Sequence, residues 1–387
     1  MPFDTSKTSM TSTVPLLEPI TMGSTTLDNR VFMGPLTRSR SQHPKNTQSA
    51  LHALYYSQRA SAGLIVSEAT QISQQGQGYA WTPGIYTPEQ VESWKLVTDA
   101  VHIAGGRIFC QLWHVGAISH QIFQPNNGAP LSSSEFTPEG EAFVGDLHED
   151  GPTVPHPTAK AMSLEEIIKL KEDYRHAARC AKKAGFDGVE LHAANGYLLD
   201  QFMRSSVNKR NDEYGGSIEN RIRLVGEILD VLIDELGANS IGIRLSPTGG
   251  AGGSYDDDPV STYVAAAKLV AIKKIAYMHV VRPNTHTGGD DSGDLSDKVV
   301  SGMRDAFSGT FIANGGFSPS EANEWIAQGK ADAIAFGRLF LANPDLPQRI
   351  VSGSDLNEPD EDTFYGGGAA GYVDYPKLFS KTSLLSG

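Results

Sequence analysis

The chain has 387 residues, 39% of them hydrophobic, which is ample for a sizeable core. Its 45 acidic against 32 basic side chains give a net charge of −13, which argues against a nucleic-acid binder because clustered Lys and Arg hold phosphate backbones. There is no run of eighteen apolar residues and no signal-peptide pattern, so we expect neither membrane insertion nor secretion. Cys110 and Cys180 lie among apolar neighbours, which indicates buried thiols in a reducing, cytoplasmic compartment.

Residues 1–15 are polar and are expected to form a disordered leader, and 16–30 are typical of a hairpin that turns at Gly23 and Ser24. Eight short apolar, β-branched runs then alternate with segments of helical period. The predicted strands are 31–33, 63–67, 107–112, 188–191, 241–245, 277–281, 310–313 and 331–336, and the predicted helices include 89–104, 163–184, 219–236, 259–274, 295–307 and 318–329. Cap signals at Ser163, Asp258 and Ser318 support three of these helices.

Strict alternation of strands and helices requires parallel pairing, and eight such units close into a (β/α)8 barrel. An open doubly wound sheet is the alternative. We therefore expect one barrel domain over 16–387, with a long insertion at 114–160 after the third strand and an extension over 352–387. Further loops at 249–258 and 282–296 follow the fifth and sixth strands. All three loops lie at the carboxyl ends of strands, where barrel enzymes build their active sites.

Polar side chains gather at the ends of the predicted strands, namely Thr37, Arg38, Glu68, Gln111, Trp113, His114, His192, Asn195, Tyr197 and Arg244. His192 and Asn195 can donate two hydrogen bonds to one oxygen, and Tyr197 can donate a proton. Each has a structural alternative, since a strand-end histidine is often structural, Asn-Gly can be a turn, and a tyrosine ring can cap the core. Their shared position favours the functional interpretation.

Glycines after the last two strands form a second signal, in Asn314-Gly315-Gly316 and Gly337-Arg338. Barrels bind phosphate there through backbone N–H groups, and Arg338 can add a bidentate contact. The alternative is turn glycines beside a surface arginine. The run 249–253 lacks a dinucleotide fingerprint, and Asp256, Asp257 and Asp258 suit a helix start better than a cation site. Without a metal motif, the pattern favours an organic cofactor such as flavin mononucleotide (FMN).

Between Leu17 and Leu378 the sequence resembles the old yellow enzyme family of flavin-dependent ene reductases, which are single-domain FMN barrels. The motifs are GPLTRSR at 34–40, YYSQRASAGLIVSEAT at 55–70, CQLWHVG at 110–116, ELHAANGYLLDQF at 190–202, NDEYGGSIENRIR at 211–223, RLSP at 244–247, AFGRLFLANPDLP at 335–347, and FYGGG with GYVDYP within 364–376.

The resemblance implies roles for particular residues. It implies that tightly but non-covalently bound FMN contacts Pro35, Leu36, Thr37, Ala69, Gln111 and Arg244, with Gly315, Gly316, Gly337 and Arg338 around its phosphate. It implies that His192 and Asn195 bind the substrate's oxygen, that Tyr197 is the proton donor, and that Tyr79, Trp113 and Tyr365 line the pocket. The motif around Gly116 often continues with Arg in the family, whereas this chain has Ala117, and the loop at 282–291 has no close match.

The implied reaction is ping-pong: NADH or NADPH reduces the flavin, whose N5 then delivers hydride to an enone or nitroalkene, with nitrate esters as a further substrate class. No metal, nucleic acid or membrane is expected to take part, and the protein is expected to be a monomer or homodimer. A phosphate-binding barrel isomerase or lyase, and a flavin-holding protein without turnover, remain alternatives.

Overall fold

Eight parallel strands form a closed barrel in the computed structural model, which describes residues 14–149, 151–248, 250–282 and 293–378. The strands are β3 (Val31–Met33), β4 (Ile65–Val66), β6 (Ile108–Trp113), β11 (Gly188–Ala193), β12 (Ile241–Leu245), β13 (Tyr277–Val281), β14 (Thr310–Asn314) and β15 (Ala333–Phe336). Each pairs with the next, and the pairing of β15 with β3 closes the ring, while β5 (Thr70–Gln71) adds to β6. The predicted barrel is confirmed, and the open sheet is excluded.

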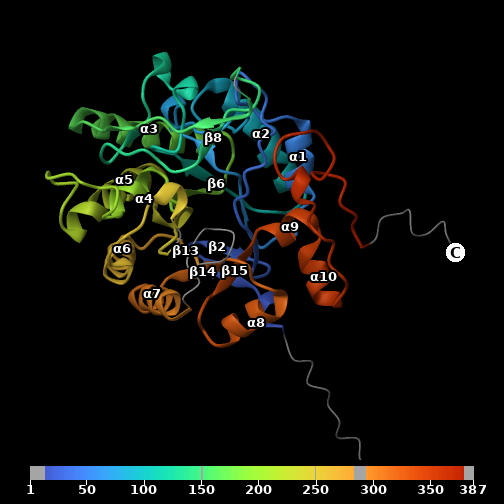
Figure 1. Ribbon diagram of the computed structural model, residues 1–387. Coiled ribbons are helices and arrows are strands. Elements are labelled where there is room, and N and C mark those ends of the chain that lie inside the picture. The colour runs from blue at the N-terminus through green and yellow to red at the C-terminus, as the bar shows by residue number, and fades with distance from the viewer. Residues whose placement is uncertain (1–13, 150, 249, 283–292, 379–387) are drawn as a thin grey trace, which may run out of the picture.

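Helices surround these strands in Figure 1. They are α1 (Ala50–Ser57), α2 (Pro88–Ile103), α3 (Leu164–Lys183), α4 (Leu198–Met203), α5 (Ile218–Leu236), α6 (Pro259–Lys273), α7 (Gly293–Ala306), α8 (Pro319–Ala327), α9 (Arg338–Ala342) and α10 (Leu346–Ser352). The predicted caps are present: Ser163, Asp258 and Ser318 each accept a hydrogen bond from a backbone N–H of the first turn. Helix α7 begins two residues before the predicted start, inside the span expected to be loop.

The hydrophobic core has two parts, one inside the barrel and one between the strands and the helices. The predicted hairpin, β1 (Ile20–Met22) with β2 (Thr25–Leu27), packs Met22 and Leu27 against the interior side chains Phe32, Phe109 and Tyr277. It therefore closes the barrel at the end opposite the carboxyl ends of the strands. No helix in the described ranges has both the length and the apolar character needed to cross a bilayer.

The insertion at 114–160 contains more regular structure than the predicted loop. It carries β7 (Leu131–Ser132), β8 (Glu141–Phe143), β9 (Thr153–Pro155) and β10 (Lys160–Ala161), which pair as β7 with β10 and β8 with β9. The β8–β9 hairpin has a small core of its own, in which Ala142, Val144 and Val154 pack with Phe123. These ladders are only two or three residues long, too short to show a strand period in the sequence.

The C-terminal segment returns beside α1, as the red trace in Figure 1 shows. Arg38 donates hydrogen bonds to the carbonyl oxygens of Phe364 (2.9 Å) and Gly371 (2.8 Å), and Arg40 donates to Thr363 O (2.9 Å). One buried and one half-buried cation thus fix a segment that lacks helix or strand over most of its length. Residues 1–13 of the predicted leader (1–15), residues 283–292 of the predicted loop (282–296) and residues 379–387 lie outside the described residues.

Candidate active site

A cavity of about 400 Å³ opens at the carboxyl ends of the barrel strands. We call it the mouth cavity, and it is lined by Thr37, Ser39, Tyr79, Trp113, Phe143, Tyr197 and Tyr365. Five of these seven were predicted site residues and come from distant parts of the chain. Ser39 and Phe143 were missed. Phe143 reaches the cavity from the β8–β9 hairpin, and nothing in the sequence indicated where that insertion folds.

The turn between β11 and α4 carries Asn195 and brings Tyr197 to the mouth cavity, whereas Asn195 and His192 are not among the residues that line it. Asn195 has φ of +58°, which asparagine tolerates better than most residues, and its N–H donates to Ser246 Oγ at 2.6 Å. The next N–H, from Gly196, donates to Asp200 Oδ2 at 2.7 Å, and Gln201 Nε2 donates to Gly196 O at 2.7 Å. Buried partners therefore hold the turn on both sides, and its geometry does not depend on a bound ligand.

Asp200 is itself fixed inside the protein. It forms a fully buried ion pair with Arg204 at 2.9 Å and accepts a hydrogen bond from the phenol of Tyr263. An ion pair without solvent depends on its geometry, because each charge has lost its hydration. This pair ties the turn that carries Asn195 and Tyr197 to helices α4 and α6.

The phenol of Tyr197 is half-buried at the mouth cavity and remains protonated. Its oxygen lies 3.1 Å from that of Tyr79, and its ring stands edge-on to Trp113 with centroids 5.0 Å apart. Burial, reinforced by Tyr79, raises the pKa of Tyr197 well above its ordinary value. A phenol in this state is a proton donor at neutral pH.

His192 lies within β11, one residue beyond the predicted end of that strand, and its ring is against Tyr197 with centroids 5.1 Å apart. Burial lowers the pKa of His192 well below its ordinary value, and the charge of Arg244 lowers it further. The imidazole is therefore neutral. Its Nδ1 is buried and has no hydrogen-bond partner in the described part of the chain, so it is open to hydrogen bonding by a ligand.

Arg244 is a cation only 9% exposed, and its guanidinium faces no carboxylate within ion-pair distance among the described residues. Its Nη2 donates to Asn314 Oδ1 at 2.9 Å, while its Nε has no partner there. Burial lowers the pKa of Arg244, although Glu190 partly offsets this. A buried cation without a direct counter-ion suits a bound group that carries negative charge.

The residues predicted to hold FMN lie along this same end of the barrel. Thr37 lines the mouth cavity, and Ala69 packs beside Trp113 in a small cluster under it. Pro35 and Leu36 are half-buried after β3, and Gln111 is buried in β6, the neighbour of β11. Neutral hydrogen-bonding groups with one buried cation fit the polar edge of a flavin ring, whose reduced form is anionic.

The predicted phosphate-binding glycines come after β14 and β15. Gly315 and Gly316 have φ of +126° and +71°, values that favour glycine, and Gly337 joins β15 to α9. A Cβ at Gly315 would lie 2.7 Å from the backbone oxygen of Arg282, so the chain requires glycine there. Arg338 follows at the first position of α9, where it forms an ion pair with Glu361 at 3.0 Å.

Three strand-end residues of the predicted set have structural partners. Arg38 fixes the C-terminal segment, as described above. Glu68 is buried and accepts hydrogen bonds from Gln48 Nε2 (3.0 Å) and the Arg38 N–H (3.4 Å), and burial raises its pKa to about 7. His114 Nδ1 accepts from the Gly116 N–H at 3.1 Å. These three side chains therefore form hydrogen bonds within the protein that stabilise the chain around the cavity.

Other predicted features are structural as well. Cys110 and Cys180 are free and buried, and burial raises the pKa of the Cys110 thiol to about 12. Asp258 caps α6, as expected, and Asp256 forms an ion pair with Arg221 at 3.3 Å. The described residues contain no group of three or more His, Cys, Asp or Glu side chains arranged to hold a metal ion.

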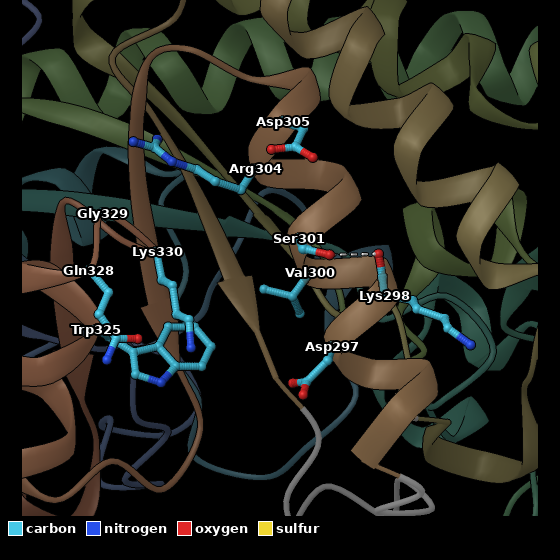
Figure 2. A pocket seen from close by; sticks show the side chains of 10 residues that line it. All are labelled: Asp297, Lys298, Val300, Ser301, Arg304, Asp305, Trp325, Gln328, Gly329 and Lys330. Atoms are coloured by element: carbon cyan, nitrogen blue, oxygen red, sulfur yellow. Dashed lines mark hydrogen bonds between the residues drawn. The ribbon is translucent and has the colours of Figure 1, made fainter.

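A second hollow, of about 410 Å³, lies on the outside of the barrel between α7 and α8. We call it the outer hollow, and Figure 2 shows Asp297 and Val300 of α7 on the side of that helix toward Trp325 and Lys330. Two of its charged groups have partners within the protein: Arg304 pairs with Asp332 at 2.9 Å, and Lys330 lies over the Trp325 ring. It contains none of the groups predicted to be catalytic.

Known proteins share this fold and sequence. The model of the NADH:flavin oxidoreductase / NADH oxidase family matches residues 15–357. The chain is 43% identical over 369 residues to 12-oxophytodienoate reductase 2 of Arabidopsis thaliana, covering 95% of this chain and 96% of that protein.

Two solved structures extend the comparison. Morphinone reductase has a TM-score of 0.89 and 45% identity, covering 94% of this chain and 96% of that one. An old yellow enzyme homologue from Zymomonas mobilis has a TM-score of 0.88 and 40% identity, covering 93% and 99%. The class of protein is therefore a flavin oxidoreductase built on a (β/α)8 barrel. Within that class, the chain belongs to the old yellow enzyme family, which is FMN-dependent.

Proposed function

We propose that this protein reduces the activated C=C bond of α,β-unsaturated carbonyl or nitro compounds, with NADH or NADPH as reductant and nitrate esters as a further substrate class. One observation carries the proposal: a protonated, half-buried Tyr197 lines the mouth cavity, and the ring of a buried, neutral His192 lies against it. A proton donor beside a hydrogen-bond donor is what the reduction of a polarised double bond requires.

FMN would be held by Thr37, Gln111 and Arg244 around its ring, and by Gly315, Gly316, Gly337 and Arg338 around its phosphate. Pro35, Leu36 and Ala69 would supply backbone and packing contacts. Bound there, FMN supplies the redox chemistry, since it accepts hydride from a nicotinamide nucleotide and passes it to a carbon. The buried Arg244 cation, which has no direct carboxylate partner in the described chain, supports this assignment.

His192 and Asn195 would hold the substrate's carbonyl or nitro oxygen. Hydrogen bonds to that oxygen stabilise the negative charge that develops on it, and they draw electron density from the carbon that receives hydride. The neutral state of His192 suits this role, because a neutral imidazole donates one hydrogen bond without adding a formal charge. The rigid turn at 194–197 fixes the position of Asn195 in advance.

Tyr197 would deliver the proton to the neighbouring carbon. Tyr79, 3.1 Å away, is placed to hold the Tyr197 hydroxyl in one orientation, and Trp113 excludes water from one side of the ring. Tyr79, Trp113 and the 65% exposed Tyr365 would complete the aromatic walls of the substrate site. The relatives support this proposal, since two are named reductases of 12-oxophytodienoate and of morphinone, and one morphinone reductase structure contains tetrahydroNAD.

The test is the effect of Tyr197→Phe on the two half-reactions, measured by stopped flow on the flavin-loaded protein. A general acid contributes about 10²- to 10⁴-fold in rate, so reoxidation of the flavin by an enone should slow by about that factor. Reduction of the flavin by NADH or NADPH should stay near the wild-type rate, because no proton from Tyr197 is needed there. Equal losses in both half-reactions would refute the role, and purified protein that takes up no flavin would refute the function.

A further inference from the structure

A glutamate lies inside the barrel beneath the mouth cavity, where no acidic residue was predicted to act. Glu190 is fully buried in β11, two residues before His192. Side chains two apart on a strand point to the same side, so both project into the barrel interior. A carboxylate at such a depth is costly unless it is hydrogen-bonded.

Three side chains offset this cost by donating hydrogen bonds to Glu190. Gln111 Nε2 donates to Oε1 at 2.7 Å, while the Tyr277 hydroxyl (3.0 Å) and His279 Nδ1 (2.9 Å) donate to Oε2. Burial would raise the pKa of Glu190, but His279, Arg244 and Gln111 outweigh burial and lower it. Burial also lowers the pKa of His279. The carboxylate is therefore ionised.

The barrel is shaped to allow this arrangement. Gly242 of β12 is in register with both Glu190 and Tyr277, so it separates them on the barrel wall. A Cβ at Gly242 would lie 2.0 Å from Cζ of Tyr277. The missing side chain lets the tyrosine ring cross β12 and bring its hydroxyl to Glu190.

The hydrogen bond from Gln111 fixes the orientation of an amide in the proposed FMN site. With one Nε2 hydrogen directed at Glu190, the amide cannot rotate by 180° without placing its oxygen against the carboxylate. Its second N–H and its Oε1 make no other hydrogen bond within the described residues and can serve a ligand with both a donor and an acceptor.

Glu190 also acts on the charge of Arg244. The two groups do not form a direct ion pair, yet each shifts the other's pKa in the sense expected for opposite charges. Glu190 therefore offsets part of the positive potential that Arg244 creates at the cavity. A bound group that gains negative charge at the cavity therefore experiences the combined electrostatic potential of Arg244 and Glu190.

We propose that Glu190 is a positioning residue of the FMN site: it orients the Gln111 amide and tempers the Arg244 charge, and so sets how tightly oxidised flavin is held relative to reduced flavin. The inference rests on the proposed function, because it requires FMN at this site. It assigns Glu190, Tyr277 and His279 a role in tuning the flavin that is distinct from substrate binding.

The test compares the two-electron midpoint potential and the FMN release rate of the flavin-loaded wild type and Glu190→Gln. Removing a nearby negative charge favours the electron-rich reduced flavin, so the ratio of reduced to oxidised affinity should rise about tenfold, a shift of about +30 mV. Loss of the fixed amide orientation should speed FMN release on dilution about tenfold, followed by flavin fluorescence.

Tyr277→Phe provides a second variant with the opposite sign. It leaves the carboxylate charge in place but removes one donor, so the charge is less screened and the affinity ratio should fall about twofold, about −9 mV. If Glu190→Gln fails to fold, the sign of the Tyr277→Phe shift decides the proposal: a negative shift supports it, and a zero or positive shift overturns it. If Glu190 had only a structural role, the two variants would not shift the midpoint potential in opposite directions.

Glu227→Gln is the matched control, since Glu227 also accepts from a phenol, that of Tyr214, but lies on the outer helix α5. Its potential should equal that of the wild type. Wild-type potential and release rate in Glu190→Gln, or an equal shift in Glu227→Gln, would overturn the proposal. Failure of the wild type to retain FMN would instead overturn the proposed function.

Discussion

The mouth cavity and the outer hollow have nearly the same volume, about 400 and about 410 Å³, but differ in the state of their polar groups. Around the mouth cavity, Trp113 Nε1 and His192 Nδ1 are buried without partners within the described chain. In the outer hollow, none of the described side chains has a buried polar atom in that state, and Arg304 is paired with Asp332. The two volumes therefore do not distinguish the hollows, whereas buried polar atoms without a partner beside the mouth cavity do.

The two regions also differ in how their ion pairs are built, and this gives the largest expected effect. Asp200→Asn breaks the fully buried pair with Arg204 behind the mouth cavity and should lower the free energy of unfolding by about 3–5 kcal/mol. Asp332→Asn, in the half-exposed pair beside the outer hollow, should cost at most about 1 kcal/mol. Urea unfolding of both variants is the measurement, and equal losses would remove the contrast.

A second difference is the buried acid Glu68 below the mouth cavity, whose pKa burial raises from 4.5 to about 7. The folded state binds this proton more tightly than the unfolded state does, so stability falls as the pH rises from about 4.5 through 7. The loss is about 3 kcal/mol. Glu68→Gln should remove that part of the pH dependence, measured by urea unfolding at pH 5 and pH 8. Parallel pH curves for the two proteins would contradict the assignment.

Neutralising a cation should lower the FMN affinity at the mouth cavity but not at the outer hollow. Arg244→Gln removes the charge beneath the mouth cavity, and loss of a charged hydrogen bond costs about 1.5–3 kcal/mol, or about ten- to hundredfold in FMN affinity. Arg304→Gln, beside the outer hollow, should leave that affinity unchanged. Flavin fluorescence after dilution of each holoprotein measures the difference. An equal loss in both variants would show that the effect is not local.

The smallest expected effect is that of pH on the rate of flavin reoxidation, which should stay nearly constant. Burial lowers the pKa of His192 and raises that of Tyr197, so neither group changes protonation between pH 6 and pH 8. The rate of flavin reoxidation by an enone should vary by less than about twofold over that range. Stopped-flow traces at fixed ionic strength test this. A titration centred near pH 6.5 would mean that His192 is more solvated than its surroundings indicate.

Much of the fold was predictable because its signals are local. Buried parallel strands appear as short β-branched runs, and helix starts appear as caps, so the barrel strands and helices such as α3 and α6 were found near their observed bounds. Helices α4, α9 and α10 were missed because each is seven residues or shorter, which is less than the period analysis requires. The ladder of β7 with β10 was missed for the same reason.

The candidate site, like the fold, was predictable only where its signals lie close together in the sequence. His192, Asn195 and Tyr197 lie within six residues, so one short motif contains all three. Arg38 and Glu68 also follow strands, but the structure turns their side chains to backbone and side-chain partners away from the cavity. Strand-end position was a good guide to where polar groups gather. It could not distinguish those that face the cavity from those that support it.

Residue order was enough to establish alternating strands and helices, a closed barrel and the end at which its chemistry collects, since each depends on neighbours along the chain. Folding alone brought Glu190 to Gln111, Tyr277 and His279, which lie between 79 and 89 positions away. The reason is geometric. Which interior side chains meet depends on strand register and on the missing side chain at Gly242, and both arise only when the barrel closes.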